Sequence, residues 1–383
     1  MSTTQNESII SISDFFRNLK DPRIKRTKRH LLHDILTIAI LAMICGAEGW
    51  EDMEVFGEAK ETWLRTFLSL EHGIPCADTF RRVFAAIDPK QFEACFMKWI
   101  QHLAKDITGK VVAIDGKTLR RSYDKAAKKS ALHLVHAYAS ECQLLLGQVA
   151  TSEKSNEITA IPELLGLLDI QGAIVTIDAM GCQRKIAKDI VAKEADYVLS
   201  LKGNQGTLEK EVSEFFTDAL SDEKTKKNLA YSETTDGDHG RVEVRKVYVT
   251  QDISWFEDKK EWAQLSSFIR VESERYVEGK TTIEIRHFIS SLKESDAARF
   301  LHIIRSHWAV ENNLHWSLDV ALGEDACRIR KDHAPRNLSL LRKMALTMLK
   351  RNTKLKRGIK AKSKLAGWDH DFLLNTLRCG GEI

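Results

Sequence analysis

Two short apolar runs that each lead into an aspartate constrain this chain more than any other feature. Residues 111–114 read Val-Val-Ala-Ile and precede Asp115, and residues 173–177 read Ala-Ile-Val-Thr-Ile and precede Asp178. Apolar runs of this length are typical of buried strands. A carboxylate at the end of a buried strand is costly unless a positive charge compensates it. The two runs therefore predict strands whose ends present acids to a cation.

A third acid, Glu311, lies in a helical stretch rich in histidine and tryptophan, RSHWAVENNLHWSLDV. Three acids that converge from separate segments indicate a divalent-cation site with hard oxygen ligands, and such a site suits phosphoryl transfer on nucleic acid. Asp115 alone could simply begin a turn, because Asp-Gly is a turn signal. The similar setting of Asp178 favours the metal site.

Basic residues are unevenly distributed, although the net charge is only +4 from 58 basic and 54 acidic residues. Residues 17–29 contain seven Lys or Arg and one acid, and residues 342–364 contain ten Lys or Arg and no acid. Such clusters favour a polyanion as partner, because neutralising phosphates releases counterions. A solvated face or a disordered tail is the alternative interpretation of either run.

The cysteines and the apolar segments indicate where the protein works. Seven cysteines are scattered without a Cys-x-x-Cys pair, which fits a reducing cytoplasm. No basic segment followed by an apolar stretch opens the chain, so we expect no signal peptide. The most apolar segment, residues 35–47, is too short to cross a bilayer. We expect a soluble, cytoplasmic protein without a membrane partner.

The hydrophobic period changes along the chain. Residues 9–105 have helical spacing, and a turn at Gly73 before a helix with Arg81 and Arg82 resembles a helix-turn-helix, although many core helices look similar. Strands are expected at 110–115, 131–139, 144–150, 173–178 and 197–201, with helices at 156–168 and 183–194. Residues 221–292 are polar and strand-rich, and helices resume near residue 295. The order predicts a mixed α/β layer with a β insertion.

Five motifs follow one another along the chain: AIDGKTLRRS, TIDAMGCQ, LKGNQ, DGDHGRVEVR and HWAVENNLHWSLDVALGEDACR. With the expected topology, the sequence resembles the DDE transposases of bacterial insertion sequences, specifically the group of H-repeat-associated proteins. The resemblance covers nearly the whole chain. It implies an RNase H-like mixed-sheet catalytic core with a β-rich insertion between the second and third acids, and a helical N-terminal domain.

We therefore expect five parts. They are a helical DNA-binding domain (1–108), the first part of the catalytic core (109–220), the β-rich insertion (221–292), the second part of the core (293–355) and a basic C-terminal tail (356–383). The second core part carries the third acid.

The resemblance also implies an activity. A transposase of this kind binds the inverted-repeat ends of its element on double-stranded DNA, cleaves a phosphodiester and transfers the freed 3′-hydroxyl to target DNA, and we expect a homodimer in the DNA complex. Asp115, Asp178 and Glu311 would be the catalytic residues and metal ligands, with Mg²⁺ as cofactor and Mn²⁺ as substitute. The alternatives are a catalytically inactive transposase-derived DNA-binding protein and a metal-dependent nuclease without strand transfer.

The third ligand has competitors. Related transposases have an arginine before and a lysine after the third acid, whereas this sequence has His307 in the first place and Leu318 or Asp319 in the second. Competing acids are Asp319, Glu324 and Asp325. Glu311, His315 and Asp319 are spaced by four residues and share a helix face. A zinc site made by His307, Glu311 and His315 is an alternative to magnesium.

Further polar residues are candidates for contacting DNA, because they lie near the acids, at strand ends or on exposed helices. The DNA-binding candidates are Lys117, Arg81, Arg82, Lys202, Asn204, His239 and Arg241, and Gln183 lies in a similar position at a strand end. A surface or capping role is the alternative for each. We expect Trp308 and Trp316 to be packing residues rather than platforms for base stacking.

Overall fold

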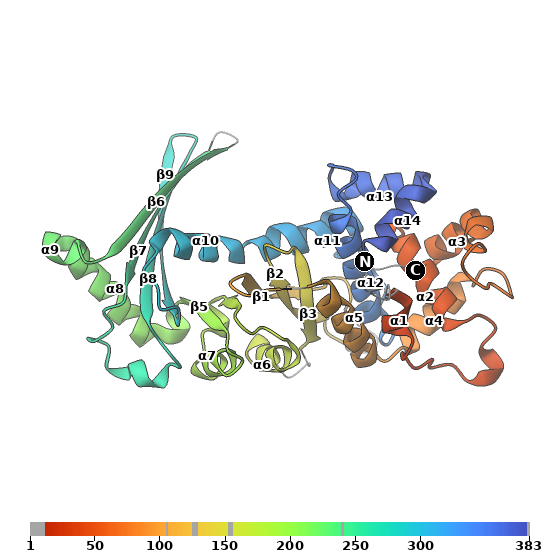
Figure 1. Ribbon diagram of the computed structural model, residues 1–383, viewed down its shortest axis with the longest axis horizontal. Helices are drawn as coiled ribbons and strands as arrows, with labels where there is room; N and C mark the ends of the chain where they lie inside the picture. The colour runs from red at the N-terminus through yellow and green to blue at the C-terminus, as the bar shows by residue number, and fades with distance from the viewer. Residues whose placement is uncertain (1–11, 105, 125–128, 152–155, 239–240, 381–383) are drawn as a thin grey trace, which may run out of the picture.

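The computed structural model describes residues 12–104, 106–124, 129–151, 156–238 and 241–380. The molecule is elongated, with a largely helical part at one end and a sheet that extends to the other (Figure 1). Within these ranges no helix is long and apolar enough to cross a membrane.

Segments from both halves of the chain build the helical part. The N-terminal helices are α1 (Ile12–Phe16), η1 (Lys25–Thr27), α2 (Leu32–Ile44), α3 (Trp50–Leu64), α4 (Ala77–Ala86) and α5 (Pro89–Leu103). The C-terminal helices are α12 (Ala334–Arg351), α13 (Ile359–Trp368) and α14 (His370–Arg378). Helices α2 and α12 pack against each other, and most side chains of both helices are buried. The expected helical N-terminal region is confirmed.

The helix-turn-helix interpretation does not fit the connection between α3 and α4. Residues 65–76 separate the two helices, which is much longer than the three- or four-residue turn of that motif. Helix α4 instead packs against α3 and α12. Arg81 and Arg82 still lie on its exposed side, where both pair with Asp78.

A nine-stranded sheet has the order β3-β2-β1-β4-β5-β9-β8-β7-β6. The strands are β1 (Val111–Thr118), β2 (His133–Ala139), β3 (Leu144–Ala150), β4 (Ile174–Ile177), β5 (Asp196–Leu201), β6 (Ala230–Asp238), β7 (Arg241–Thr250), β8 (Ser267–Val277) and β9 (Lys280–Ser290). β1, β4 and β5 are parallel, and the other neighbouring pairs are antiparallel. The expected mixed α/β fold is confirmed.

Helices cover both faces of this sheet. The crossovers α6 (Glu157–Leu167) and α7 (Arg184–Val191) lie beneath it in Figure 1, and α10 (Ala297–His307) and α11 (Trp316–Leu322) lie above it. A π-helical turn, η5 (Val310–His315), joins α10 to α11. The 16-residue helix α8 (Gly206–Ser221) follows β5. The remaining short elements are η2 (Ala179–Gly181), η3 (Gly203–Gln205), α9 (Glu223–Lys226) and η4 (Glu257–Glu261).

The strands of residues 221–292 extend the core sheet instead of forming a sheet of their own. Strand β9 pairs with β5, and β8, β7 and β6 follow outward. Because neighbours in register share a face, the face of β7–β9 that α10 meets carries a series of arginines. Together with one arginine of α10 they line a groove that also contains Glu243 and Glu284, with which four of the arginines pair. It is here called the arginine groove, after Arg241, Arg245, Arg275, Arg286 and Arg305.

Part of the second basic run is buried, so the run is not one continuous solvated face, and its interpretation as DNA-binding stays a prediction for its exposed residues. Arg342 and Lys343 lie inside α12 and are 2% and 1% exposed. Arg342 donates to the carbonyls of Leu322 and Glu48, and Lys343 donates to Gln148. These cations hold helices together. Residues 356–383 were expected to form a basic tail, but residues 359–368 and 370–378 form helices α13 and α14.

Candidate active site

Asp115 lies inside β1 and does not end it. Pairing of β1 with the parallel strand β4 stops at Ile114, but pairing with β2 continues to Thr118. The prediction that the strand ends at Asp115 is therefore wrong, and so is the alternative that Asp115 begins a turn. The ladder with β2 keeps the backbone extended, while the missing β4 partner opens the edge beside the carboxylate.

Gly116 allows a second acid to approach the strand. A Cβ atom at Gly116 would lie 2.0 Å from Glu157 Oε1, so any other residue would displace that carboxylate. Glu157 is the first residue of α6, and its Oε1 lies 2.8 Å from His133 Nε2. His133 Nδ1 in turn lies 2.7 Å from Thr118 Oγ1. The Asp-Gly pair thus brings α6 against β1 rather than turning the chain.

Asp178 follows β4 and caps η2. Its Oδ1 accepts hydrogen bonds from the backbone N–H groups of Met180 (3.1 Å) and Gly181 (3.4 Å). Asn204, expected to contact DNA, donates from Nδ2 to the carbonyl of Ala179 at 2.5 Å. Gln183 similarly donates to the carbonyl of Met180 at 3.3 Å. The amides of Asn204 and Gln183 therefore hold the loop that presents Asp178.

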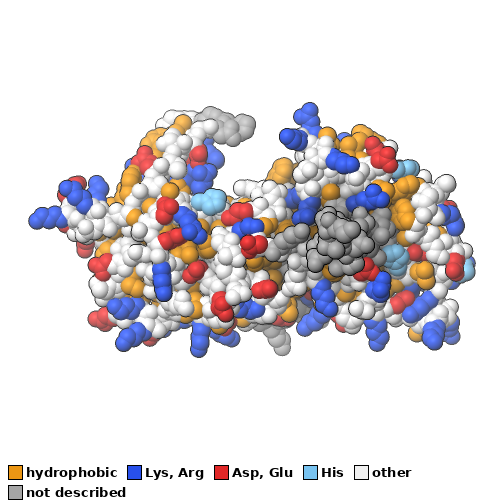
Figure 2. All heavy atoms as spheres, viewed as in Figure 1, with side chains coloured by type: hydrophobic (Ala, Val, Ile, Leu, Met, Phe, Trp, Pro, Cys, Tyr) orange, Lys and Arg blue, Asp and Glu red, His pale blue; other side chains and the backbone are white. Residues whose placement is uncertain are grey.

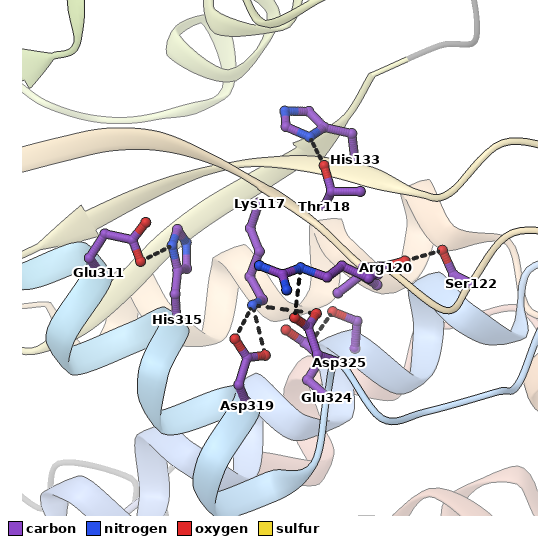
Figure 3. Close-up of polar contacts among 12 residues, drawn as sticks. Lys117, Thr118, Arg120, Ser122, His133, Glu311, His315, Asp319, Glu324 and Asp325 are labelled. Carbon is purple, nitrogen blue, oxygen red and sulfur yellow. Dashed lines mark hydrogen bonds and ion pairs between the residues drawn. The ribbon is translucent and has the colours of Figure 1, made fainter.

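Glu311 and His315 reach β1 from the π-helical turn. The Nδ1 atom of His315 lies 3.7 Å from Asp115 Oδ2 and 3.4 Å from Glu311 Oε2. One ligand atom from each of the three residues lies within 4.8 Å of the others. Figure 3 shows Glu311 and His315 side by side on the helix that crosses the strand. This cluster could hold a metal ion.

A cleft of about 270 Å³ brings together the three acids expected from the sequence. Asp115, Asp178 and Glu311 all line it, from β1, the end of β4 and η5. Lys202, expected to contact DNA, lines the same cleft, and so does Arg286 of the arginine groove. The cleft lies at the carboxyl ends of the parallel strands, where open α/β sheets bind their ligands.

The electrostatics of the cleft fit a divalent cation. Burial raises the pKa of Asp115 to about 7, and three neighbouring carboxylates add to the rise: Glu311, Glu157 and Asp178. Burial likewise raises the pKa of Asp178. Burial lowers the pKa of His315 to about 3, so this imidazole is neutral. Converging carboxylates beside a neutral imidazole form a donor set for a divalent ion.

The acids that compete with Glu311 are held by hydrogen-bonding or basic partners. The Nζ atom of Lys117 lies 2.6 Å from Asp319 Oδ2, and Arg120 Nε lies 3.4 Å from Asp325 (Figure 3). The carboxylate of Glu324 is buried and accepts a hydrogen bond from Ser339 at 2.7 Å. Of the four acids, Glu311 is the one whose carboxylate joins the cluster with Asp115.

The set proposed for zinc is not assembled. Among the described residues the ligand atoms of Glu311 and His315 meet Asp115, while His307 is not in the cluster. The Nδ1 atom of His307 lies 3.0 Å from Thr176 Oγ1. Burial lowers the pKa of His307 to about 4, so this imidazole is neutral.

The remaining DNA candidates lie apart from the acids or are already engaged. Lys117 is 8% exposed and its ammonium is held by Asp319. Arg81 and Arg82 lie on α4, and Arg241 lies in the arginine groove. His239 falls outside the described residues.

Two features were missed or misjudged from the sequence. Trp308 and Trp316 are 53% and 62% exposed, so the prediction that they are packing residues is wrong. Trp308 borders both the cleft and the arginine groove, with the guanidinium of Arg286 5.7 Å from its ring centroid. His136 is fully buried, and its Nδ1 lies 3.1 Å from His315 Nε2. Its position opposite Asp115 depends on the β1–β2 register, which the sequence alone does not give.

Comparison with known proteins identifies the family. The family described as Transposase DDE domain matches residues 106–348, more than half of the chain, and the family described as DDE_Tnp_1-associated matches residues 13–100. The chain belongs to the DDE transposases. The resemblance inferred from the five motifs, and with it the RNase H-like fold, is confirmed.

This DDE transposase has relatives of similar length. "Putative transposase YncI" of Escherichia coli O157:H7 is 42% identical over 98% of this chain and 96% of its own. "H repeat-associated putative transposase YhhI" of Escherichia coli K12 is 41% identical over 92% of this chain and 93% of its own. A cryo-EM structure of piggyBac transposase in a synaptic complex with hairpin DNA aligns with 96% of this chain and 76% of that chain, at 11% identity and a TM-score of 0.41.

Proposed function

We propose that this DDE transposase binds the inverted-repeat ends of its own element and catalyses metal-dependent cleavage and strand transfer of DNA. The observation that carries the proposal is the convergence of Asp115, Asp178 and Glu311 on one cleft from three separate elements. Each acid is held by local structure: the β1–β2 ladder, the η2 cap and the π-helical turn. Preorganised acids of this kind are what in-line displacement at phosphorus requires.

The cofactor of this proposal is Mg²⁺, with Mn²⁺ as substitute. Asp115, Asp178 and Glu311 would hold the ions: all three line the cleft, and ligand atoms of Asp115 and Glu311 lie within 4.8 Å of each other. When bound, two ions would activate the attacking oxygen and stabilise the leaving oxygen. The chain itself supplies an acid-lined cleft that also contains Lys202, whose ammonium can orient a phosphate.

The DNA partner is supported by the arginine groove next to the cleft. Arg286 and Trp308 line both cavities, so a strand in the cleft continues into the groove. Arginine forms bidentate hydrogen bonds with phosphate. Figure 2 shows the surface hollowed between the β6–β9 arm and α13, above α10. We place the DNA in this hollow, with Arg81, Arg82 and the exposed part of residues 17–29 as further contacts.

The proposal also covers the oligomeric state, the cellular location and the division of the chain into parts. The transposase would act as a homodimer on double-stranded DNA, and it would work in the cytoplasm. The five parts bounded at residues 108, 220, 292 and 355 would be its functional divisions.

The test uses the purified full-length protein and DNA that carries the ends of its element. Asp115→Asn and Asp178→Asn should each abolish nicking in Mg²⁺ or Mn²⁺, leave end binding intact in Ca²⁺, and be no worse when combined, because the acids act as one unit. Asp169→Asn, at an exposed acid away from the cleft, is the matched control and should cut normally. Cutting by Asp115→Asn would place the active site elsewhere.

Three other outcomes separate the alternatives. A wild-type protein that binds its ends but never nicks them is a transposase-derived DNA-binding protein. One that nicks but never joins is a nuclease. One that joins its ends to target DNA is the transposase proposed here.

A further inference from the structure

A row of buried polar side chains crosses the sheet behind the cleft. Asp115 of β1 is in register with His136 of β2, and His136 is in register with Gln148 of β3. Residues in register on neighbouring strands point to the same face. His136 is 0% and Gln148 1% exposed. The row faces η5, α11 and α12, which bring their own polar groups to it: Glu311, His315, Asp319 and Lys343.

His315 connects this row to the acids. Its ring is 3% exposed, and its two nitrogens face different partners. Nε2 lies 3.1 Å from His136 Nδ1, and Nδ1 lies between the carboxylates of Asp115 and Glu311, at 3.7 and 3.4 Å. The imidazole therefore has one nitrogen against the carboxylates of Asp115 and Glu311 and one in the core of the sheet.

The contact between the two rings can hold one proton. A neutral imidazole carries a single N–H, and only its other nitrogen has a lone pair that can bind a cation. When His315 donates from Nε2 to His136 Nδ1, the lone pair of His315 Nδ1 points into the acid cluster. When His136 Nδ1 is the donor, His315 accepts at Nε2 and carries its own proton on Nδ1. Its Nδ1 atom then cannot bind a cation. His136 Nε2 has no hydrogen-bond partner in the described part of the chain, so the hydrogen bond to His315 is the one that orients the His136 ring.

We propose that His315 Nδ1 is a further ligand of the divalent-ion site, beside Asp115 and Glu311, and that His136 is a positioning residue that holds His315 in the required tautomer. This inference rests on the metal dependence in the proposed function. It makes one ion's donor set mixed, with carboxylate oxygens and an imidazole nitrogen. Imidazole suits Mn²⁺ and later divalent metals better than Mg²⁺, which prefers oxygen. Asp178 lines the same cleft as Asp115 and Glu311 but is not a member of this cluster of described residues.

The metal alone is the probe, and activity is not the readout. Mn²⁺ bound to the full chain is examined by pulsed electron paramagnetic resonance, which detects the ¹⁴N coupling of a directly bound imidazole. The wild-type protein should show this coupling. His315→Gln should lose it and bind Mn²⁺ more weakly, with a smaller change for Mg²⁺. The matched control is His302→Gln, because the side chain of this α10 histidine is 66% exposed. This variant should keep the ¹⁴N coupling.

The positioning role is tested separately at His136. His136→Phe keeps a ring in the core but removes the hydrogen bond, and should weaken Mn²⁺ binding about 10- to 100-fold, the usual effect of losing a group that orients a ligand. His136→Gln can still accept a hydrogen bond from the Nε2–H of His315 and should recover part of the affinity. Equal losses in the Phe and Gln variants, or a loss that follows thermal stability alone, would overturn the positioning role.

The outcomes also separate this inference from the proposed function. Mn²⁺ that binds without ¹⁴N coupling, or with coupling that survives His315→Gln, overturns the histidine ligand while leaving metal-dependent cleavage in place. A wild-type protein that binds no Mn²⁺ with or without DNA overturns both. Coupling that disappears only in His315→Gln supports the mixed donor set.

Discussion

Asp115 carries a cost in the metal-free protein that its function would explain. Its carboxylate is buried, faces three other acids and accepts a hydrogen bond from its neighbour's N–H. A group placed for binding a cation is poorly solvated when the cation is absent. Such a residue is expected to reduce stability for the sake of the site.

This cost predicts a pH dependence of stability without metal. The folded pKa of Asp115 is about 7, above the ordinary aspartate value, so between about pH 4 and pH 7 the folded state binds more protons than the unfolded state. Stability therefore falls as pH rises through this window. Asp115→Asn removes the effect, and its advantage in free energy of unfolding should grow by roughly 2–4 kcal/mol between pH 4.5 and pH 8.

Urea unfolding in the presence of a chelator measures this difference. Asp169→Asn should show no such growth, because its carboxylate is exposed. A constant gap between Asp115→Asn and wild type at both pH values would contradict the burial of a proton-binding carboxylate.

Helix α11 docks on β1 through a pair that the sequence did not reveal. Lys117 follows Asp115 by two residues and shares its face of the strand, yet its ammonium turns to Asp319 of α11 at 2.6 Å. The side chain of Lys117 is 7% exposed and that of Asp319 29%. The pair fixes α11, and through the π-helical turn it fixes Glu311.

Breaking this pair should therefore affect stability more than DNA affinity. Lys117→Met leaves Asp319 partly buried without its cation and should cost about 1–3 kcal/mol in the free energy of unfolding. Adding Asp319→Leu should recover part of the loss, because Asp319 then leaves no unpaired charge and Asp325, the second partner of Lys117, keeps Arg120. Urea unfolding and end binding in Ca²⁺ are measured for all three proteins. A large loss of end binding with unchanged stability would instead make Lys117 a phosphate contact.

At the scale of elements, hydrophobic periodicity was sufficient for the strands and helices between residues 110 and 201. It failed where a long-range contact overrides a local signal. Asp115-Gly116 has the composition of a turn, but the ladder with β2 keeps it in a strand. Lys343 belongs to a basic run, but α12 buries it beside Gln148. His136 is unremarkable in sequence, and only the register places it next to Asp115.

At the scale of the molecule, one continuous sheet joins the catalytic core to the β arm. The antiparallel pairing of β9 with β5 makes the arm a rigid extension of the strands that carry Asp115 and Asp178. The face of the arm toward α10 carries the arginine groove. Backbone hydrogen bonds, and not a flexible linker, therefore set the position of the arginine groove relative to the cleft.

The groove should contribute phosphate contacts without sequence preference. Arg241 and Arg275 are about half exposed, and both pair with the buried Glu243. Arg245 also lies 2.7 Å from Glu243, so Glu243 keeps a partner when the other two arginines are replaced. Arg241→Gln with Arg275→Gln should weaken end binding and reduce the slope of log K against log salt by about 1.8, because two phosphate contacts are lost. Discrimination between end and unrelated DNA should stay the same. The matched control changes Lys224 and Lys226 of α9, away from the groove, to Gln. An unchanged slope in the arginine variant, or the same reduction in the lysine control, would place the DNA outside the groove.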